Sequence, residues 1–143
     1  MSAAPRVVLA DVVDRDITVD EVSAVVATDQ DGAVVTFAGV VRDHDGGKGV
    51  TALEYERHPS ASAVIAEVAR TIADDHPEVR IAVLHRVGAL VVGDVALAAA
   101  VSSPHRAEAF AACAALVDLV KERVPIWKHQ QFTDGSDEWV AAL

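Results

Sequence analysis

The chain has 143 residues, of which 52% are hydrophobic and 4% aromatic, and its formal net charge is −10. This length suits one domain spanning residues 1–143 with a sizeable core, and the hydrophobic content excludes a disordered tail. The acidic balance argues against general nucleic-acid binding, since a phosphate backbone selects a basic face, and no apolar run is long enough for a membrane span.

The single cysteine, Cys113, excludes an internal disulfide and is typical of a reducing compartment. The first residues lack the basic segment and apolar core of a secretory signal, so we expect a cytoplasmic protein. Cys113 lies in an apolar run over residues 110–116, which favours a buried, unreactive thiol over a nucleophile.

The first 41 residues predict two strands and a short helix. Residues 6–13 are rich in valine and favour a strand, and Thr18 with Glu21 matches a capping box that begins a helix. Residues 33–41 carry β-branched side chains almost continuously, which predicts a strand buried on both faces. Gly39 within that strand indicates close approach by another backbone or a ligand.

A polar, glycine-rich stretch over residues 43–49 follows Arg42. Its glycine spacing does not match a phosphate-binding loop, so we expect either a mobile lid or a hairpin connection. Residues 50–57 then read as the returning strand, with Leu53 and Tyr55 on one face.

The second half predicts two main helices with strands between them. Ser60 is a plausible N-cap for the first of these helices, and residues 79–86 and 95–101 favour strands. Ser103 and Pro104 match the cap and first position of the longer helix. We therefore predict a single α+β domain with a mixed sheet.

Two lysines flank the end of the long helix. Because Pro125 cannot continue a helix, Lys121 should lie in the last helical turn and Lys128 in the extended segment beyond. Two ammonium groups brought together at this corner repel unless an anion lies between them. Trp127 beside Lys128 indicates a partly covered site, whereas the alternative is two solvated surface lysines.

His105 and Arg106 form a basic pair at the start of the long helix. Cations are disfavoured there by the helix dipole, so the pair with the free backbone N–H groups indicates an anion site for phosphate or carboxylate. The alternative is that both side chains point into water. Arg42 is a further anion-binding candidate, although it could instead pair with Asp43 or Asp45.

Other catalytic chemistries have little support in the sequence. The six histidines show no paired spacing and the lone cysteine gives no thiolate cluster, so no metal or other cofactor is expected. The chain also lacks the Gly-x-Ser-x-Gly elbow of many serine hydrolases.

Seven motifs occur in one order along the chain: residues 35–42, 53–56, 85–88, 103–110, 121–128, 134–135 and 139–140. In this combination the chain resembles the large, catalytic subunit of molybdopterin synthase, the MoaE family. The resemblance implies an α/β hammerhead-type fold and a homodimer within a heterotetramer. The partner is then a small ubiquitin-like sulfur carrier whose C-terminal Gly-Gly tail ends in a thiocarboxylate.

The implied activity is a sulfurtransferase reaction. Sulfur moves from the thiocarboxylate to cyclic pyranopterin monophosphate and forms the dithiolene of molybdopterin, a step of molybdenum cofactor biosynthesis. The resemblance makes Lys121 and Lys128 catalytic. The field at the C-terminal end of the long helix favours the Lys121 ammonium, so we assign placement of the acyl tail to Lys121 and proton transfer mainly to Lys128, which lies beyond that field beside Trp127. The implied substrate-binding residues are Val40, Val41, Arg42, His105, Arg106, Lys121, Lys128, His129 and Gln130, and the implied tail pocket is formed by Phe37, Arg42 and Lys121.

The chain departs from the family pattern at several places, among them position 130, where relatives usually have an acidic residue and this chain has Gln130. Two non-catalytic functions also fit the residues. One is a module that binds an anionic metabolite and regulates a partner, and the other is a scaffold that binds acyl tails. Only the pair of Lys121 and Lys128, together with the resemblance, favours catalysis over these.

Overall fold

The computed structural model of the protein describes residues 6–141. This part contains the helices α1 (Val19–Val26), α2 (Ala61–Asp75) and α3 (Arg106–Arg123). Its strands are β1 (Val7–Val13), β2 (Ala33–Val40), β3 (His44–Asp45), β4 (Lys48–Arg57), β5 (Arg80–Arg86), β6 (Gly88–Leu90), β7 (Val95–Ser103), β8 (Ile126–Phe132) and β9 (Asp137–Ala141). None of the helices in residues 6–141 is long and apolar enough to cross a membrane.

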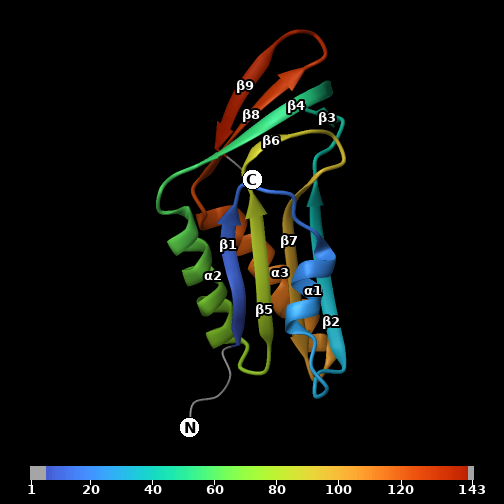
Figure 1. Cartoon of the computed structure of the whole chain (residues 1–143), viewed down its shortest axis with the longest axis vertical. Helices are drawn as coiled ribbons and strands as arrows, with labels where there is room; N and C mark the ends of the chain where they lie inside the picture. The colour runs from blue at the N-terminus through green and yellow to red at the C-terminus, as the bar shows by residue number, and fades with distance from the viewer. Residues whose placement is uncertain (1–5, 142–143) are drawn as a thin grey trace.

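The strands form two sheets at different levels of an elongated molecule (Figure 1). The main sheet has the order β1-β5-β7-β2, in which β1 and β5 are parallel and the other pairs antiparallel. The end sheet has the order β3-β4-β8-β9, and β6 pairs with β4. The predicted α+β class with a mixed sheet and two main helices is therefore confirmed.

The main sheet is covered on both faces. Leu97, Ala99 and Val101 of β7 belong to the larger core, which includes α2 and α3, whereas Ala98 and Ala100 belong to a smaller core with α1. Successive side chains of a strand point to opposite faces, so α1 lies on one face and the longer helices on the other. β7 is consequently buried on both faces.

β2 is an edge strand, and the prediction that it is buried on both faces is wrong. Its strand neighbour in the described part of the chain is β7 alone, and its side chains alternate between partly buried and exposed. Val34 and Val40 are 40% and 48% exposed. The prediction failed because a run of β-branched residues suits a half-buried edge strand as well as a central one.

The predicted N-cap residues agree with the structure for α1 and α2 but not for α3. The Thr18 hydroxyl accepts a hydrogen bond from the Glu21 N–H (3.1 Å), and the Glu21 carboxylate accepts one from the Thr18 N–H (2.9 Å), which confirms the capping box. Ser60 is the N-cap residue of α2, although its side chain makes no capping hydrogen bond. The predicted cap at Ser103 is wrong, because Ser103 still pairs with Ala33 in the main sheet.

The long helix starts and ends close to a proline. α3 has His105 as its N-cap and begins at Arg106, so Pro104 lies before the helix and not at its first position. At the other end, Val124 is extended before Pro125, as the residue preceding a proline usually is. β8 begins immediately after Pro125, which confirms the predicted corner between helix and strand.

The glycine-rich stretch after β2 is a hairpin connection. His44 and Asp45 pair with Gly49 and Lys48 in antiparallel register, and the turn between them uses Gly46 and Gly47 at φ 57° and 80°. L-residues with side chains rarely adopt these backbone angles. Of the two alternatives for this stretch, the structure thus shows the hairpin.

Candidate active site

A cleft of about 420 Å³ lies where the main sheet, α3 and the end sheet meet. We call it the junction cleft, and its lining residues are Gly39, Val40, Arg42, Tyr55, His85, Ala96, Leu97, Lys121 and Lys128. They come from the ends of β2 and α3, the start of β7, and strands β4, β5 and β8. The cleft thus exists only where residues from six elements of the fold meet.

Both predicted catalytic lysines line the junction cleft. Lys121 lies in the last turn of α3, Lys128 in β8, and Arg42 beyond the end of β2. The sequence contains only one further lysine, Lys48, so two of three lysines gather at one cleft of a chain with a net charge of −10. Within residues 6–141 neither cleft lysine has a carboxylate partner inside 4 Å, whereas Arg42 lies 3.6 Å from Asp45. The site therefore offers positive charge to an anionic ligand.

Strand pairing explains which side chains accompany Lys128. In the antiparallel pair of β4 and β8, Tyr55 lies opposite Lys128 and Leu53 lies opposite Gln130. Residues two apart on a strand share a face, so these four side chains project together. Leu53 and Tyr55 are nearly fully buried, as their shared face predicts.

Gly39 lines the junction cleft at a position with little room for a side chain. The register between β2 and β7 shifts between Gly39 and Val40. A Cβ atom on Gly39 would lie 3.3 Å from Leu97 Cβ and 3.3 Å from Phe37 Cε1. These close neighbours are side-chain atoms, and the nearest backbone atom, the Leu97 carbonyl oxygen, would lie 3.8 Å away. Close approach by another backbone, as predicted, is therefore not what limits this position, and a side chain there would crowd Leu97 and Phe37.

His85 lines the junction cleft together with the lysines and is fully buried. Its Nδ1 lies 2.7 Å from the Arg86 carbonyl oxygen, which can only accept, so Nδ1 carries the proton and Nε2 is left as an acceptor. Nε2 is buried and has no hydrogen-bond partner within the described residues. Burial lowers the pKa of His85 to about 4, with the Arg86 carbonyl opposing this and the charge of Lys121 adding to it. His85 is therefore neutral at pH 7.

A smaller cavity of about 60 Å³ adjoins the junction cleft on the side of Lys128. We call it the side cavity, and it is lined by Val40, Val41, Arg42, His44, Asp45, Leu53, Tyr55, Lys128 and Gln130. It brings the predicted residues Val40, Val41, Arg42 and Gln130 next to Lys128. Gln130 is 2% exposed, and its amide nitrogen donates to Asp45 (2.6 Å) and to Glu138 (3.0 Å).

A third depression runs between the free edge of β2 and the flank of α3. This edge groove has a volume of about 420 Å³ and is lined by Val35, Thr36, Phe37, Phe110, Cys113, Ala114, Val117 and Asp118. Phe110 is 61% exposed, whereas Cys113 is buried and burial raises the pKa of its thiol. The cysteine is thus a poor nucleophile, as expected. Phe37 and Gly39 share one face of β2, so the groove leads along this strand toward the junction cleft.

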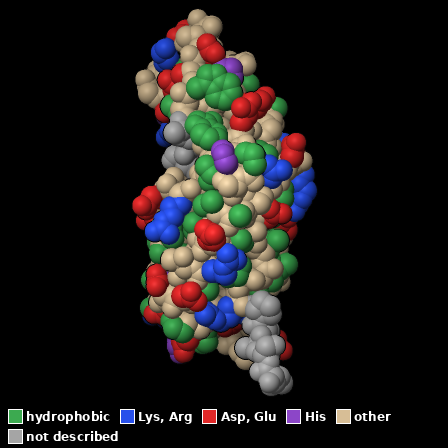
Figure 2. All heavy atoms as spheres, turned by 90° about the vertical axis from the view of Figure 1, so that its left-hand side faces the viewer, with side chains coloured by type: hydrophobic (Ala, Val, Ile, Leu, Met, Phe, Trp, Pro, Cys, Tyr) green, Lys and Arg blue, Asp and Glu red, His purple; other side chains and the backbone are tan. Residues whose placement is uncertain are grey.

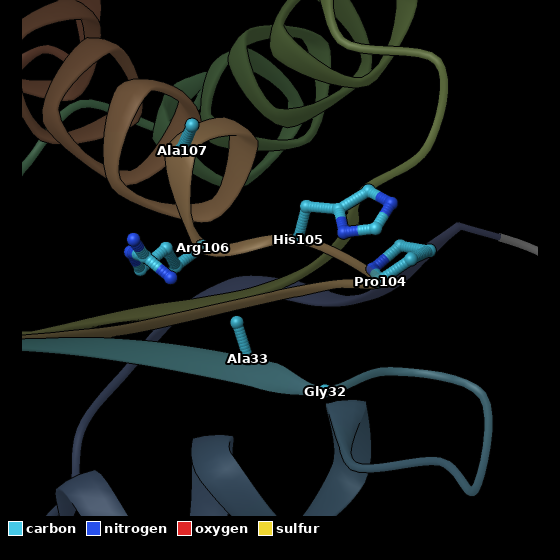
Figure 3. Close-up of a pocket in the computed structure, with 6 residues that line it drawn as sticks. All are labelled: Gly32, Ala33, Pro104, His105, Arg106 and Ala107. Atoms are coloured by element: carbon cyan, nitrogen blue, oxygen red, sulfur yellow. The ribbon is translucent and has the colours of Figure 1, made fainter.

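His105 and Arg106 do not join the lysines within one copy of the chain. They line a separate pocket of about 380 Å³ together with Gly32, Ala33, Pro104 and Ala107 (Figure 3). The pocket lies at the opposite end of α3, and at 1.5 Å per residue Lys121 is about 24 Å away along the helix. Both side chains are exposed and point in different directions.

His129 also lies apart from the junction cleft. It neighbours Lys128 on β8 and therefore projects to the opposite face. There its ring stacks on Trp139 (centroids 4.4 Å apart) and its Nε2 lies 2.6 Å from an Asp137 oxygen. Trp127 and Trp139 are 41% and 54% exposed, and hydrophobic side chains gather at this end of the molecule, whereas acidic and basic groups mix over the α2 face (Figure 2).

Sequence reasoning missed three residues of the site. Tyr55 was predicted only as a buried strand residue, and His85 only as part of a motif. For Asp45 the sequence predicts only an alternative ion pair with Arg42. Among the described residues no group of three or more His, Cys, Asp or Glu side chains is arranged to hold a metal ion.

Similarity to known proteins agrees with this geometry. The family model described as MoaE protein matches residues 12–123. The chain belongs to the MoaE family. A protein of Mycobacterium tuberculosis named molybdopterin synthase catalytic subunit 1 is 42% identical over 128 residues, which cover 89% of this chain and 86% of that protein. A molybdopterin synthase catalytic subunit of a Nostoc species is 39% identical over 127 residues, or 87% of this chain and 77% of that protein.

The MoaE fold is also found in solved structures. The crystal structure of molybdopterin synthase from Staphylococcus aureus matches with a TM-score of 0.86 and 32% identity, covering 96% of this chain and 98% of that chain. The predicted resemblance to the MoaE family is therefore confirmed.

Proposed function

We propose that this MoaE chain is the catalytic subunit of a molybdopterin synthase and acts in the cytoplasm. In this reaction sulfur passes from the C-terminal thiocarboxylate of a small ubiquitin-like subunit to cyclic pyranopterin monophosphate. The observation that carries the proposal is the convergence of Lys121, Lys128 and Arg42 at the junction cleft of an acidic protein.

The chemistry of the cleft fits this reaction. A thiocarboxylate sulfur is itself a good nucleophile, so the enzyme needs no thiol of its own, in agreement with the burial of Cys113. The cleft must supply positive charge for the cyclic phosphate and protons for ring oxygens that leave. Arg42 can only bind the anion, because its guanidinium does not give up its proton, whereas each lysine ammonium can.

The edge groove gives the tail of the partner a path to the lysines. The free edge of β2 exposes backbone N–H and C=O groups, which an extended peptide can pair with as an added strand. A tail lying there passes Phe37 and reaches the junction cleft at Gly39. Two glycines at its end suit this narrow passage, because they carry no side chains.

We propose that a second copy of the chain completes the site. His105 and Arg106 lie about 24 Å from Lys121 along one helix, so they cannot bind the same small substrate within one copy. In a homodimer with one small subunit on each copy, His105 and Arg106 of the second copy can bind the phosphate or the pterin. His129, on the far face of β8, then also becomes a candidate for contact across the dimer.

Reconstitution tests the proposed function directly. Purified chain is mixed with a thiocarboxylated ubiquitin-like subunit and cyclic pyranopterin monophosphate, and the dithiolene product is measured. Lys128→Arg keeps the charge but removes the transferable proton, so we expect it to lose most turnover while both ligands still bind. The matched control is Lys48→Arg, because Lys48 pairs with Asp134 (3.4 Å) away from the cleft.

The same experiment separates catalysis from binding alone. A regulatory module or a scaffold would bind the anionic precursor or the tail and form no dithiolene. Wild-type turnover by Lys128→Arg would reduce Lys128 to an electrostatic anchor. Absence of product from the wild-type chain with both ligands bound would refute the proposed activity.

A further inference from the structure

Gln130 makes an unusual pair of contacts for a buried side chain. Its amide nitrogen donates one hydrogen bond to Asp45 Oδ2 (2.6 Å) and another to Glu138 Oε1 (3.0 Å). The acceptors come from β3 and β9, on either side of the strand pair β4 and β8. Only a group with two donors can hold two carboxylates in this way. A carboxylate at position 130 would instead place three negative groups together.

Asp45 is the more enclosed of the two carboxylates and faces the cations of the site. Its side chain is 33% exposed and lies 3.6 Å from the Arg42 guanidinium. It lines the side cavity with Lys128. The hydrogen bond from Gln130 lowers the pKa of Asp45 most, and the charges of Lys128 and Arg42 lower it further. Asp45 is therefore ionised at neutral pH and stabilises both cations.

We propose that Asp45, held in place by Gln130, is a positioning residue for Lys128 and Arg42. This inference rests on the proposed sulfurtransferase function and adds a carboxylate to its site. The chain lacks an acid at position 130, and the hairpin after β2 supplies one to the same cavity from a position 85 residues earlier in the sequence.

The arrangement matters because a lysine side chain is long and flexible. An ammonium at the end of four methylene groups loses considerable rotamer freedom when it is held in one place. A fixed carboxylate on the cavity side favours those rotamers of Lys128 that keep its ammonium at the wall of the junction cleft. Neither Lys121 nor Lys128 has a carboxylate within 4 Å in the described part of the chain, so Asp45 acts on Lys128 through its charge in the cavity that they share and not through a direct ion pair.

Exchange of the two side chains provides the sharpest test. Asp45→Asn removes the negative charge, and Gln130→Glu sets a third carboxylate against Asp45 and Glu138. The double variant restores a carboxylate–amide pair between positions 45 and 130 with the positions exchanged, and it leaves the new carboxylate facing Glu138. Because a hydrogen bond to a charged group contributes roughly a factor of ten or more, we expect each single variant to lower kcat about tenfold. KM for the pterin precursor should change much less.

The double variant should recover part of the kcat that Gln130→Glu loses, since non-additivity is the signature of a direct interaction, and the remaining deficit comes from the carboxylate at position 130 that faces Glu138. The matched control is Asp43→Asn, because Asp43 is 78% exposed, contacts His44 (2.8 Å), and is not among the residues that line the side cavity. Urea unfolding of each variant measures any loss of stability. Wild-type kcat for Asp45→Asn, or a double variant no better than Gln130→Glu, would overturn the inference.

A second readout does not depend on turnover. The chain has three lysines, so reductive ¹³C-methylation yields few NMR signals, which lysine-to-arginine variants assign. Asp45→Asn should move the Lys128 signal further than that of Lys48, which lies opposite Asp45 in the hairpin but pairs with Asp134, and Asp43→Asn should move neither. An unmoved Lys128 signal refutes the positioning role even if the wild-type chain proves to be inactive, whereas inactivity with a moved signal refutes only the proposed reaction.

Discussion

Acidification should destabilise this protein through His85. Burial lowers the pKa of this histidine from 6.5 to about 4 in the folded chain, whereas the unfolded chain keeps an ordinary value. Between these two values the unfolded state binds more protons than the folded state, so stability falls as the pH falls. Above pH 6.5 the ring is neutral in both the folded and the unfolded chain, so it does not lower the stability of the fold. The loss of stability is complete near pH 4.

The size of the effect follows from the depressed pKa. One pKa unit corresponds to about 1.4 kcal/mol, so the fall from 6.5 to about 4 destabilises the fold by about 3 kcal/mol. Single domains are stable by only about 5–15 kcal/mol in total. The loss is therefore a large share of the stability that is present at pH 7.

Urea unfolding followed by circular dichroism at pH 7, 6, 5 and 4 measures this loss. The comparison is with His85→Phe, which keeps an aromatic ring against Tyr55, whose own ring lies 5.1 Å away edge-on. Carboxylates with lowered pKa values, such as Glu21 and Asp134, also weaken the fold in acid, but they are shared by both proteins. The wild type should lose about 3 kcal/mol more than the variant between pH 7 and pH 4. A difference that stays constant across this range would refute the buried, neutral state of His85.

Four further outcomes are expected. Lys121→Arg should retain more dithiolene formation than Lys121→Ala, since the charge that holds the tail remains; equal losses would exclude a purely electrostatic role. Arg106→Ala should weaken binding of the cyclic phosphate by about 1.5–3 kcal/mol, measured by calorimetry, with the unfolding midpoint unchanged. Deleting the two terminal glycines of the small subunit should abolish turnover and reduce its affinity, and full activity would remove the tail from the mechanism. Thr18→Ala should lower the free energy of unfolding, measured by urea titration, by about 1 kcal/mol through loss of the capping box of α1. An unchanged free energy of unfolding would contradict that cap.

Local signals in the sequence were sufficient for several features of the site. Pro125 ends α3 because it cannot donate the helical hydrogen bond, so the positions of Lys121 and Lys128 on either side of the corner could be predicted. The alternation in β4 placed Leu53 and Tyr55 on the buried face. Each of these features depends on backbone chemistry within a few residues.

Other features depended on the order of strands in the sheets. The sequence of β2 suits a central or an edge strand, and only its position beside β7 alone leaves a free edge and a groove along α3. The motif that contains His85 does not predict a neutral, buried ring in the same cleft as Lys121. Its environment comes from Tyr55 on β4 and from α3, which are distant in sequence.

The pairing of Asp45 with Gln130 shows the same limit. Either residue alone is an ordinary polar side chain, and 85 positions separate them. The hairpin after β2 and the register of β4 against β8 bring them to one cavity beside Lys128. The chain by itself determined the start of α1, the end of α3, the buried face of β4 and the residue types of a cationic site. The tertiary structure alone decided which of those charges meet, because strand pairing and sheet order are set by packing over the whole domain and not by neighbours in the sequence.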